Sequence, residues 1–312
     1  MRVATVDIGT NTVLLLVAET QSDGSLVAVT ERATITRLGE GVDVNRRLAP
    51  AAIERTTACL AAYACVVREH GVERVAVVGT SAMRDAAGGA QVAAFVKDAF
   101  GVEARVVSGP EEARLTFRGA LTGLSRPAGR DLGVFDIGGG STEVVLGSLD
   151  PATEALAYAH SFDVGSVRLT ERHVKSDPTT ASERAEVSQS ARASFASVPA
   201  LPAGSTPVGV AGTMTTLAAV SLALVPYDGT RVHGHTMTIE ELRGVVERLA
   251  RLPLAERRTM PGMEPKRADV IVAGGLIALA LLEHWSAGAV MISDRGVRWG
   301  LAEELARSDR NV

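Results

Sequence analysis

The sequence predicts an α/β protein of two domains, and three observations lead to that prediction. The chain has 312 residues, about twice the length of an ordinary compact domain. Apolar, strand-like segments alternate along it with helix-like segments. A stretch near its start, "TVDIGTNTVLLLV" at 5–17, returns as "VFDIGGGSTEVVL" at 134–146. A repeat at this spacing indicates two related domains, because solenoid proteins repeat about every 20–50 residues.

The first half begins with three predicted strands. We expect them over 2–9, 12–20 and 25–37. Asp23 and Gly24 form the kind of pair that turns a hairpin between the second strand and the third. Pro50 then opens a long amphipathic helix that we expect to continue to about His70, where Gly71 ends it.

Two strand–helix pairs follow the long helix. The segment "ERVAVVGTSA" at 73–82 has the continuous apolar run of a buried parallel strand. We expect a helix over 89–100, a strand over 103–109 and a helix over 110–124 after it. The predicted element order of the first half is therefore βββαβαβα.

The pattern breaks around "LSRPAGRD" at 124–131 and then begins again. We expect strands over 132–138, 142–149 and 154–163, helices over 165–176 and 179–197, a strand over 206–211, helices over 213–224, 239–250 and 266–285, a strand over 289–292, and a last helix from about 295. The second half thus repeats the first with extra helices. We place the first domain at 1–124, with the C-terminal helix (294–312) returning to it, and the second at 125–293.

Composition limits the possible functions. Apolar residues make up 46% of the chain and charged residues 22%, so it can bury a sizeable core. The formal net charge of -4 provides no global basic field for nucleic acid. The longest apolar run, Val270 to Leu282, is too short to span a bilayer, and Asp7 interrupts the apolar N-terminus. Cys59 and Cys65 form no CxxC pair and are expected to be structural thiols in a reducing compartment. Together these observations predict a cytoplasmic protein without nucleic-acid or membrane partners.

The two copies of the repeat have the chemistry of phosphate-binding turns. In each copy an aspartate (Asp7 or Asp136) ends a strand, and a glycine follows within two residues, which allows a sharp turn with outward-pointing N–H groups. Hydroxyl, amide and further backbone donors come from Asn11 and Thr12 in the first copy and from Gly138, Gly139, Gly140 and Ser141 in the second. A single copy would be an ordinary hairpin turn, but two matched copies favour one phosphate-rich ligand.

Carboxylates accompany these donors. Asp7, Asp136 and Glu143 provide the oxygen ligands that a hydrated Mg²⁺ bridging to a phosphate requires. The stretch "GVAGTMTTLA" at 209–218 offers another helix start, where Thr213 could meet an anion. Because Gly-Thr also caps ordinary helices, the structural and functional interpretations of Thr213 both stay open.

The repeated element order resembles the actin-like ATPase and sugar-kinase fold, in which two such domains face a central cleft. The resemblance becomes specific in seven stretches: "DIGTNT", "GTSAMRDA", "SGPEEARLTFRGA", "DIGGGSTEVV", "GVAGTMTTLAA", "RADVIVAGGLI" and "ISDRGVRWGL". In this order they are similar to the motifs of the exopolyphosphatase and guanosine pentaphosphate phosphatase family. The similarity runs from Val3 to about Leu301, and DIGGGSTE together with SGxEEAR is highly specific.

This resemblance implies hydrolysis of terminal phosphates from inorganic polyphosphate or guanosine pentaphosphate with Mg²⁺. Longer family members carry additional C-terminal helical domains, whereas this chain resembles the short two-domain type. We therefore expect shorter polyphosphate substrates. We also expect a homodimer. An alarmone phosphatase is the alternative within the family. An ATP-binding kinase or chaperone-like module of the same fold is a second alternative, but such relatives lack the EEAR helix start.

The resemblance also assigns roles to residues. Asp136 and Glu143 match the metal and water-positioning carboxylates of the family. Asn11, Gly139, Gly140 and Ser141 match its phosphate-loop donors. Arg84 matches a phosphate-binding arginine, although it could also be a solvated residue at a helix end.

Two adjacent glutamates receive different predictions. Ser108 lies three residues before Glu111, which is the spacing of a capping box, and Pro110 sits where first-turn prolines are tolerated. Glu111 therefore has a structural role available and Glu112 does not. Glu112 matches the general base of the family, which takes a proton from the attacking water.

Other polar residues point to structural roles. His160, His173 and His284 have no partner at ligand spacing, and His233 and His235 are expected in a structural loop. Gly274-Gly275 is expected to permit close helix packing near a domain hinge. The basic cluster Arg257, Arg258, Lys266 and Arg267 could line a polyanion path or form a solvated face. We also expect the domains to close around substrate by rotation near residues 124 and 293.

Overall fold

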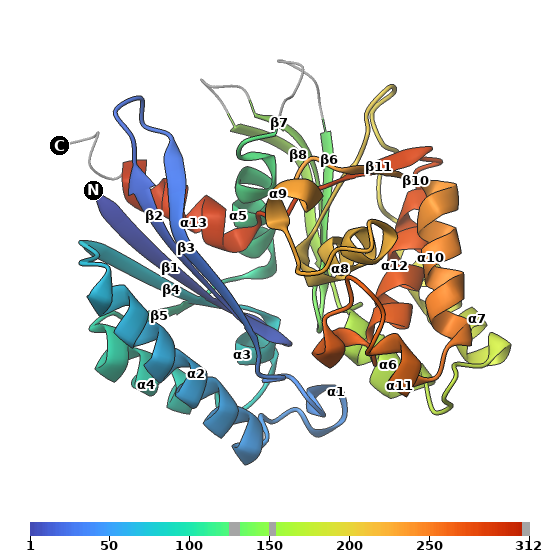
Figure 1. Ribbon diagram of the computed structural model, residues 1–312, viewed down its shortest axis with the longest axis horizontal. Coiled ribbons are helices and arrows are strands. Elements are labelled where there is room, and N and C mark those ends of the chain that lie inside the picture. The colour runs from blue at the N-terminus through green and yellow to red at the C-terminus, as the bar shows by residue number, and fades with distance from the viewer. Residues whose placement is uncertain (125–131, 150–153, 308–312) are drawn as a thin grey trace. The chain divides into compact units, whose positions relative to one another are not determined.

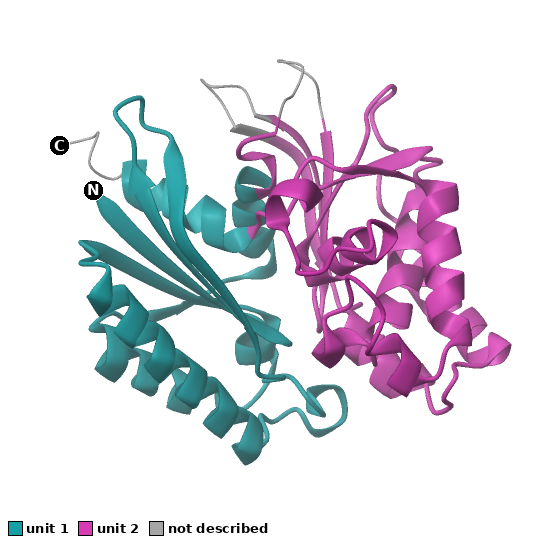
Figure 2. Cartoon of the chain, viewed as in Figure 1, with its two compact units in different colours: residues 1–119, 297–312 teal, residues 120–296 magenta. Residues whose placement is uncertain are grey.

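A computed structural model describes residues 1–124, 132–149 and 154–307 (Figure 1). The chain forms two compact units, and each is built on its own β-sheet. Unit 1 comprises Met1–Gly119 and Val297–Val312, and unit 2 comprises Ala120–Gly296 (Figure 2). The chain therefore leaves unit 1 within its fifth helix and returns to it at the start of its last helix.

Unit 1 contains a five-stranded sheet with the order β3-β2-β1-β4-β5. Its strands are β1 (Arg2–Ile8), β2 (Thr12–Thr20), β3 (Leu26–Ile35), β4 (Arg74–Gly79) and β5 (Ala104–Val106). The first three strands pair antiparallel, and β4 and β5 run parallel to β1. Gly24 has φ +82° between β2 and β3, which confirms the predicted hairpin.

Helices cover both faces of this sheet. They are α1 (Val42–Asn45), α2 (Pro50–Glu69), α3 (Ser81–Asp85), α4 (Gly89–Phe100), α5 (Gly109–Leu121) and α13 (Val297–Arg307). Successive side chains of a strand point to opposite faces. Val6 therefore joins one core cluster with Leu60 of α2, while Val3 joins another with Trp299 of α13. Gly71 has φ +59° just beyond α2, as the predicted helix end requires.

Unit 2 contains a six-stranded sheet with the order β10-β11-β9-β6-β7-β8. Its strands are β6 (Leu132–Ile137), β7 (Thr142–Leu149), β8 (Glu154–Phe162), β9 (Val208–Val210), β10 (Thr236–Thr238) and β11 (Ala289–Ile292). Again three antiparallel strands come first, and β9 and β11 continue the sheet in parallel with β6. The second half thus repeats the sheet plan of the first, with β10 added at the edge.

One large core holds the helices of unit 2. They are α6 (Ser166–His173), α7 (Ala181–Phe195), α8 (Ala211–Ser221), α9 (Gly229–Val232), α10 (Ile239–Arg251), α11 (Leu254–Arg257), the 3-10 helix η1 (Pro265–Arg267) and α12 (Ile271–His284). Helix α12 is apolar around its whole circumference because α6, α7, α8 and α10 all pack against it. Among the residues that the structure describes, no helix is both long and apolar enough to cross a membrane.

Gly274 and Gly275 confirm the predicted close packing of α12. A Cβ atom on Gly275 would lie 2.4 Å from Val246 of α10, and one on Gly274 would lie 2.6 Å from Thr213 at the start of α8. The predicted helix over 266–285 differs in one respect, because it begins as η1 and becomes α-helical only at Ile271.

Candidate active site

The two copies of the repeat form the same backbone turn. In unit 1 the Gly9 N–H donates to the Thr12 carbonyl at 3.1 Å, and in unit 2 the Gly138 N–H donates to the Ser141 carbonyl at 3.0 Å. A Cβ atom would lie 2.9 Å from that carbonyl oxygen at Gly9 and 3.3 Å from it at Gly138. Glycine is therefore favoured at the same place in both copies, because the chain closes tightly on itself there.

In unit 1 the segment after β3 supports the turn. The N–H groups of Thr36 and Arg37 donate to the Asn11 carbonyl at 3.1 and 3.0 Å, and the Gly39 N–H donates to the Thr10 carbonyl at 2.8 Å. The carbonyl groups of the turn therefore accept hydrogen bonds from the protein itself. The N–H side is then the side that can receive an anion.

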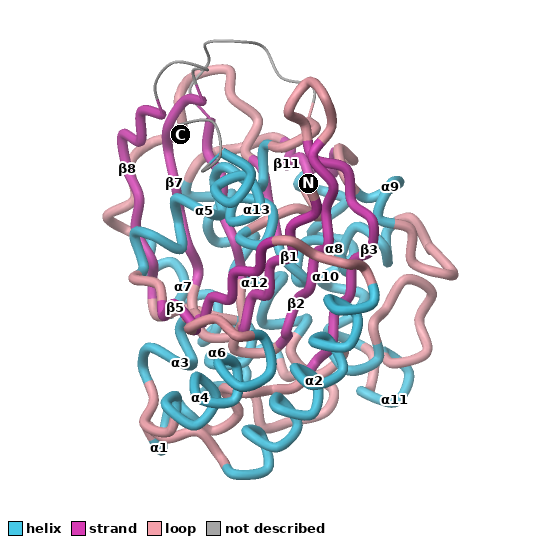
Figure 3. The backbone as a smooth tube through the Cα atoms, turned by 90° about the vertical axis from the view of Figure 1, so that its left-hand side faces the viewer, coloured by secondary structure: helices cyan, strands magenta, loops and turns pink. Residues whose placement is uncertain are grey.

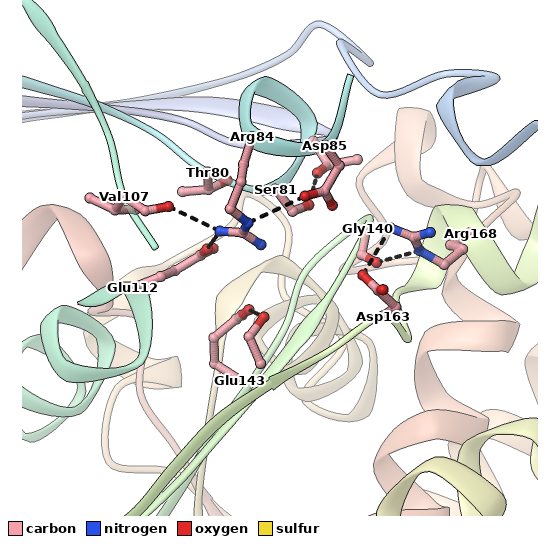
Figure 4. Close-up of polar contacts among 12 residues, drawn as sticks. Thr80, Ser81, Arg84, Asp85, Val107, Glu112, Gly140, Glu143, Asp163 and Arg168 are labelled. Carbon is pink, nitrogen blue, oxygen red and sulfur yellow. Dashed lines mark hydrogen bonds and ion pairs between the residues drawn. The ribbon is translucent and has the colours of Figure 1, made fainter. Parts of the chain in front are cut away.

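In unit 2 the segment after β8 does the same. The N–H groups of Ser166 and Val167 at the start of α6 donate to the Gly138 and Gly139 carbonyls, both at 2.9 Å. The Nε of Arg168 donates to the Gly140 carbonyl at 2.7 Å (Figure 4). All three glycine carbonyls are therefore held by the first turn of one helix.

Sequence reasoning did not select Arg168 or the glycine that precedes α6. Arg168 is 6% exposed and also pairs with Asp163 at 3.4 Å. A Cβ atom on Gly165 would lie 2.3 Å from the Gly139 carbonyl oxygen, so only glycine permits this approach. The detectable signal was "GSVR" shortly after a strand, a glycine before a helix with an arginine in its first turn.

A partly buried ion pair lies just beyond β4 and β5 in unit 1. Nη1 of Arg84 lies 2.9 Å from Oε2 of Glu112 and donates to the Val107 carbonyl at 3.1 Å (Figure 4). Nε of the same guanidinium lies 3.3 Å from Asp85. Glu112 is 6% exposed, so its carboxylate is held in one orientation by a charge-assisted bond. The structure thus brings together two residues that the sequence selected from separate motifs.

The capping-box prediction for Glu111 is half right. The Glu111 N–H donates to Ser108 Oγ at 3.4 Å, as predicted. The Glu111 carboxylate does not return to the Ser108 N–H and instead lies 3.4 Å from Nε of Arg105. An arginine on β5 was close enough to compete with a neutral N–H, because an ion pair adds charge to the hydrogen bond.

The first turn also places the predicted donors Asn11 and Thr12. Asn11 is 6% exposed and Thr12 is 8% exposed. Nδ2 of Asn11 donates to no atom in the part of the chain that the structure describes. A buried amide donor without an acceptor is costly, and a phosphate oxygen would provide one. The Thr10 hydroxyl is bonded to Ser81 at 2.8 Å, which fixes the turn to the start of α3.

The carboxylates predicted for Mg²⁺ in unit 2 lie side by side on the sheet. Asp136 of β6 and Glu143 of β7 are directly opposite in the antiparallel register, so their side chains share one face. Opposed like charges are unfavourable unless a cation or donor relieves them. Mg²⁺ commonly uses one or two carboxylates, several waters and substrate phosphates, and this pair fits that requirement.

Within residues 1–124, 132–149 and 154–307, no three His, Cys, Asp or Glu side chains form a metal-binding group. The fit therefore depends on a largely hydrated ion, not on a protein cage. Asp7 ends β1 in unit 1, where it lies opposite Val78 of β4. Its participation in the metal site stays a prediction.

Thr213 and Arg267 lie near the glycine turn at Gly138 in unit 2. The Thr213 hydroxyl donates to the Ile137 carbonyl at 3.0 Å, so its proton already connects α8 to the end of β6. A Cβ atom on Gly212 would lie 2.0 Å from the Arg267 guanidinium, which places that charge against the α8 start. Desolvation lowers the pKa of Arg267, and Glu264, Tyr227 and Asp136 oppose that shift.

Arg267 lies against the start of α8, and the other members of the predicted basic cluster have different surroundings. Arg257 is buried and pairs with Asp177 at 3.0 Å, while Arg258 and Lys266 are exposed. The four residues consequently do not form one solvated face.

Comparison with known proteins identifies the family. Residues 16–308 match the model of the Ppx/GppA phosphatase family. The chain is 38% identical to Exopolyphosphatase 2 of Mycobacterium tuberculosis over 321 aligned positions, which cover 98% of each protein. It is 30% identical to a guanosine-5'-triphosphate,3'-diphosphate pyrophosphatase of Vibrio atlanticus, over 97% of this chain and 59% of that protein.

Solved structures agree with this result. The crystal structure of the Aquifex aeolicus member of the Ppx/GppA family superimposes with a TM-score of 0.82 at 33% identity and covers 99% of this chain and 98% of that one. An exopolyphosphatase-like protein gives a TM-score of 0.90 at 31% identity, with 99% of each chain covered. The chain belongs to the Ppx/GppA phosphatase family. The prediction of an α/β fold with two actin-like domains is confirmed.

Proposed function

We propose that this protein is an exopolyphosphatase that removes the terminal phosphate of inorganic polyphosphate, with a preference for shorter chains. The observation that carries the proposal is the ion pair between the buried Glu112 at the start of α5 and the partly exposed Arg84 of α3. It supplies a fixed carboxylate of the kind that accepts a proton from water. The relative of matching length that is named an exopolyphosphatase supports the same substrate.

The substrate is held by its phosphate oxygens. In the glycine turns at Gly9 and Gly138 the N–H groups of these two glycines close the turn and several carbonyls accept bonds from protein, so we assign anion binding to the N–H groups that follow each glycine. Nδ2 of Asn11 and the hydroxyl of Ser141 add donors in the two turns. Preorganised donors of this kind stabilise charge on a transferred phosphoryl group without reorganising.

Glu112 acts on the water. As water attacks the terminal phosphorus, its proton passes to the Glu112 carboxylate, and the bond from that phosphorus to the bridging oxygen breaks. The electron pair of that bond remains on the shortened polyphosphate. Arg84 keeps the Glu112 carboxylate in place through a charge-assisted hydrogen bond. Arg84 also remains our candidate for contact with a substrate phosphate.

Asp136 and Glu143 would hold Mg²⁺, and a role of Asp7 in binding the ion stays a prediction. When bound, the ion would neutralise charge on the phosphate oxygens and help to orient the reacting groups. We extend the proposal to a homodimer that works in the cytoplasm.

Guanosine pentaphosphate is the second candidate substrate, because the Vibrio atlanticus relative is named for that class of compound. The two substrates share a terminal phosphoanhydride and differ in the group that carries it. Phosphate release from short polyphosphate, long polyphosphate, guanosine pentaphosphate and ATP separates the possibilities. We expect kcat/KM to be highest for short polyphosphate. A higher kcat/KM for guanosine pentaphosphate would assign the protein to alarmone hydrolysis instead.

A further inference from the structure

The hydroxyl of Ser161 makes a short bond to one of the two carboxylates of unit 2. Ser161 lies on β8 directly opposite Glu143 of β7, and its Oγ is 2.6 Å from Oε1 of Glu143. An ionised carboxylate can only accept, so the hydroxyl is the donor. A distance of 2.5–2.7 Å is typical of a charge-assisted O–H···O⁻ bond.

The three side chains form a row across the sheet. Asp136 is opposite Glu143, and Glu143 is opposite Ser161, so all three project from the same face. Strands β7 and β8 also run side by side in Figure 3. Glu143 is 2% exposed, so water contributes little to fixing its orientation. Ser161 donates to no other group in the described part of the chain, and its one proton is committed to Glu143.

The repeat supplies an internal comparison for this row. In unit 1 the corresponding register positions are Asp7 opposite Leu14 and Leu14 opposite Ala33. The aspartate is thus present in both units, whereas the glutamate and the serine occur together in unit 2. A serine that only stabilised the hairpin would not be expected to occur together with the glutamate. Unit 1 forms the same strand pairs with leucine and alanine.

We infer that Ser161 is a positioning residue for Glu143, fixing its carboxylate for the divalent cation and the attacked phosphate. This inference rests on the proposed function, in which Glu143 holds Mg²⁺. Without the hydroxyl the Glu143 side chain gains rotational freedom beside a like charge. The bound ion and the phosphate that it contacts would then be less well ordered.

The test compares Ser161→Ala with Ser161→Thr, which retains a hydroxyl, and with Ser148→Ala as a control. Ser148 lies on β7 of the same strand pair, so its change removes a serine hydroxyl five positions from Glu143. Mg²⁺ binding to each full-length protein is measured by calorimetry without substrate. Phosphate release from short polyphosphate is measured as a function of Mg²⁺ concentration, and thermal midpoints are recorded.

For Ser161→Ala we expect about a tenfold rise in the Mg²⁺ dissociation constant and a similar fall in kcat, since a bond to a charged group is lost. KM and the thermal midpoint should stay close to those of Ser148→Ala, and Ser161→Thr should recover most of both losses. Wild-type Mg²⁺ affinity and kcat in Ser161→Ala would overturn the inference. So would equal losses in Ser148→Ala, or a fall in the thermal midpoint alone.

The metal measurement separates this inference from the proposed function. Suppose that the wild-type protein released no phosphate, but that Ser161→Ala bound Mg²⁺ more weakly than wild type. The proposed function would then fail, and the positioning role would stand. If the wild-type protein were active and Ser161→Ala matched it in both measurements, only the positioning role would fail.

Discussion

Replacement of Glu112 by glutamine separates the proposed catalytic role of this residue from its structural role. Glutamine has the same shape and still offers a carbonyl oxygen to Arg84, which lies 2.9 Å from the glutamate. It cannot accept a proton from water. If Glu112 is the general base, kcat should fall by about 10²–10⁴, which corresponds to roughly 2.7–5.4 kcal/mol of transition-state free energy.

The cost in folding free energy should be smaller. The change weakens one charge-assisted hydrogen bond at a site that is 6% exposed, and such bonds contribute about 1–3 kcal/mol. The protein should therefore remain folded, and its substrate affinity should change little. The assay measures kcat by phosphate release, substrate binding by calorimetry, and the thermal midpoint for the same preparation.

Glu111→Gln is the matched control. Glu111 is one residue away and pairs with Arg105 at 3.4 Å, with its side chain 30% exposed. Partly exposed pairs contribute about 0–1 kcal/mol, so both kcat and stability should stay close to wild type. If a folded Glu111→Gln protein lost its turnover while Glu112→Gln kept it, the roles of the two glutamates would have to be exchanged.

Three further predictions concern the turn, the metal and pH. Gly165→Ala places a methyl group 2.3 Å from the Gly139 carbonyl oxygen, so KM for polyphosphate should rise at least about tenfold, and an unchanged KM would refute the contact. Excess chelator should abolish phosphate release and added Mg²⁺ should restore it; undiminished hydrolysis would exclude a required divalent ion. Bonds from the Thr180 and Lys175 N–H groups lower the pKa of Glu183 to about 2. The ionised Glu183 carboxylate therefore makes its full contribution to folding stability above about pH 4.5, and this contribution is lost as the pH falls toward 2. The difference in thermal midpoint between wild type and Glu183→Ala should accordingly shrink from pH 6 to pH 3, and a constant difference would contradict this sign.

The sequence predicts the long elements because their patterns are strong. The three antiparallel strands of each unit and the helices from Pro50 and Ile239 lie close to their expected bounds. The elements that it does not predict have three to five residues, among them α1, α3, α9, α11 and β10. A segment that short contains too few residues to display a period. Its conformation is determined by neighbours that are distant in sequence.

The candidate site divides in the same way. Gly138, Glu112 and Arg84 could be selected because each belongs to a recognisable local motif. Ser161 could not, because its role depends on which residue lies opposite it in three dimensions. Arg168 had one local signal, a glycine before a helix with an arginine in its first turn. An isolated serine on a strand has no distinguishing sequence context. Only the register of β7 with β8 shows that it meets a carboxylate.

Attack of water on the terminal phosphorus of polyphosphate can be followed by isotope tracing. Short polyphosphate is incubated with the enzyme and Mg²⁺ in ¹⁸O-labelled water, and the products are examined by ³¹P NMR and by chain length. We expect one ¹⁸O atom in each released orthophosphate and polymers shortened one unit at a time. Label on the new end of the shortened polymer, internal cleavage into long fragments, or no release of phosphate would contradict this expectation.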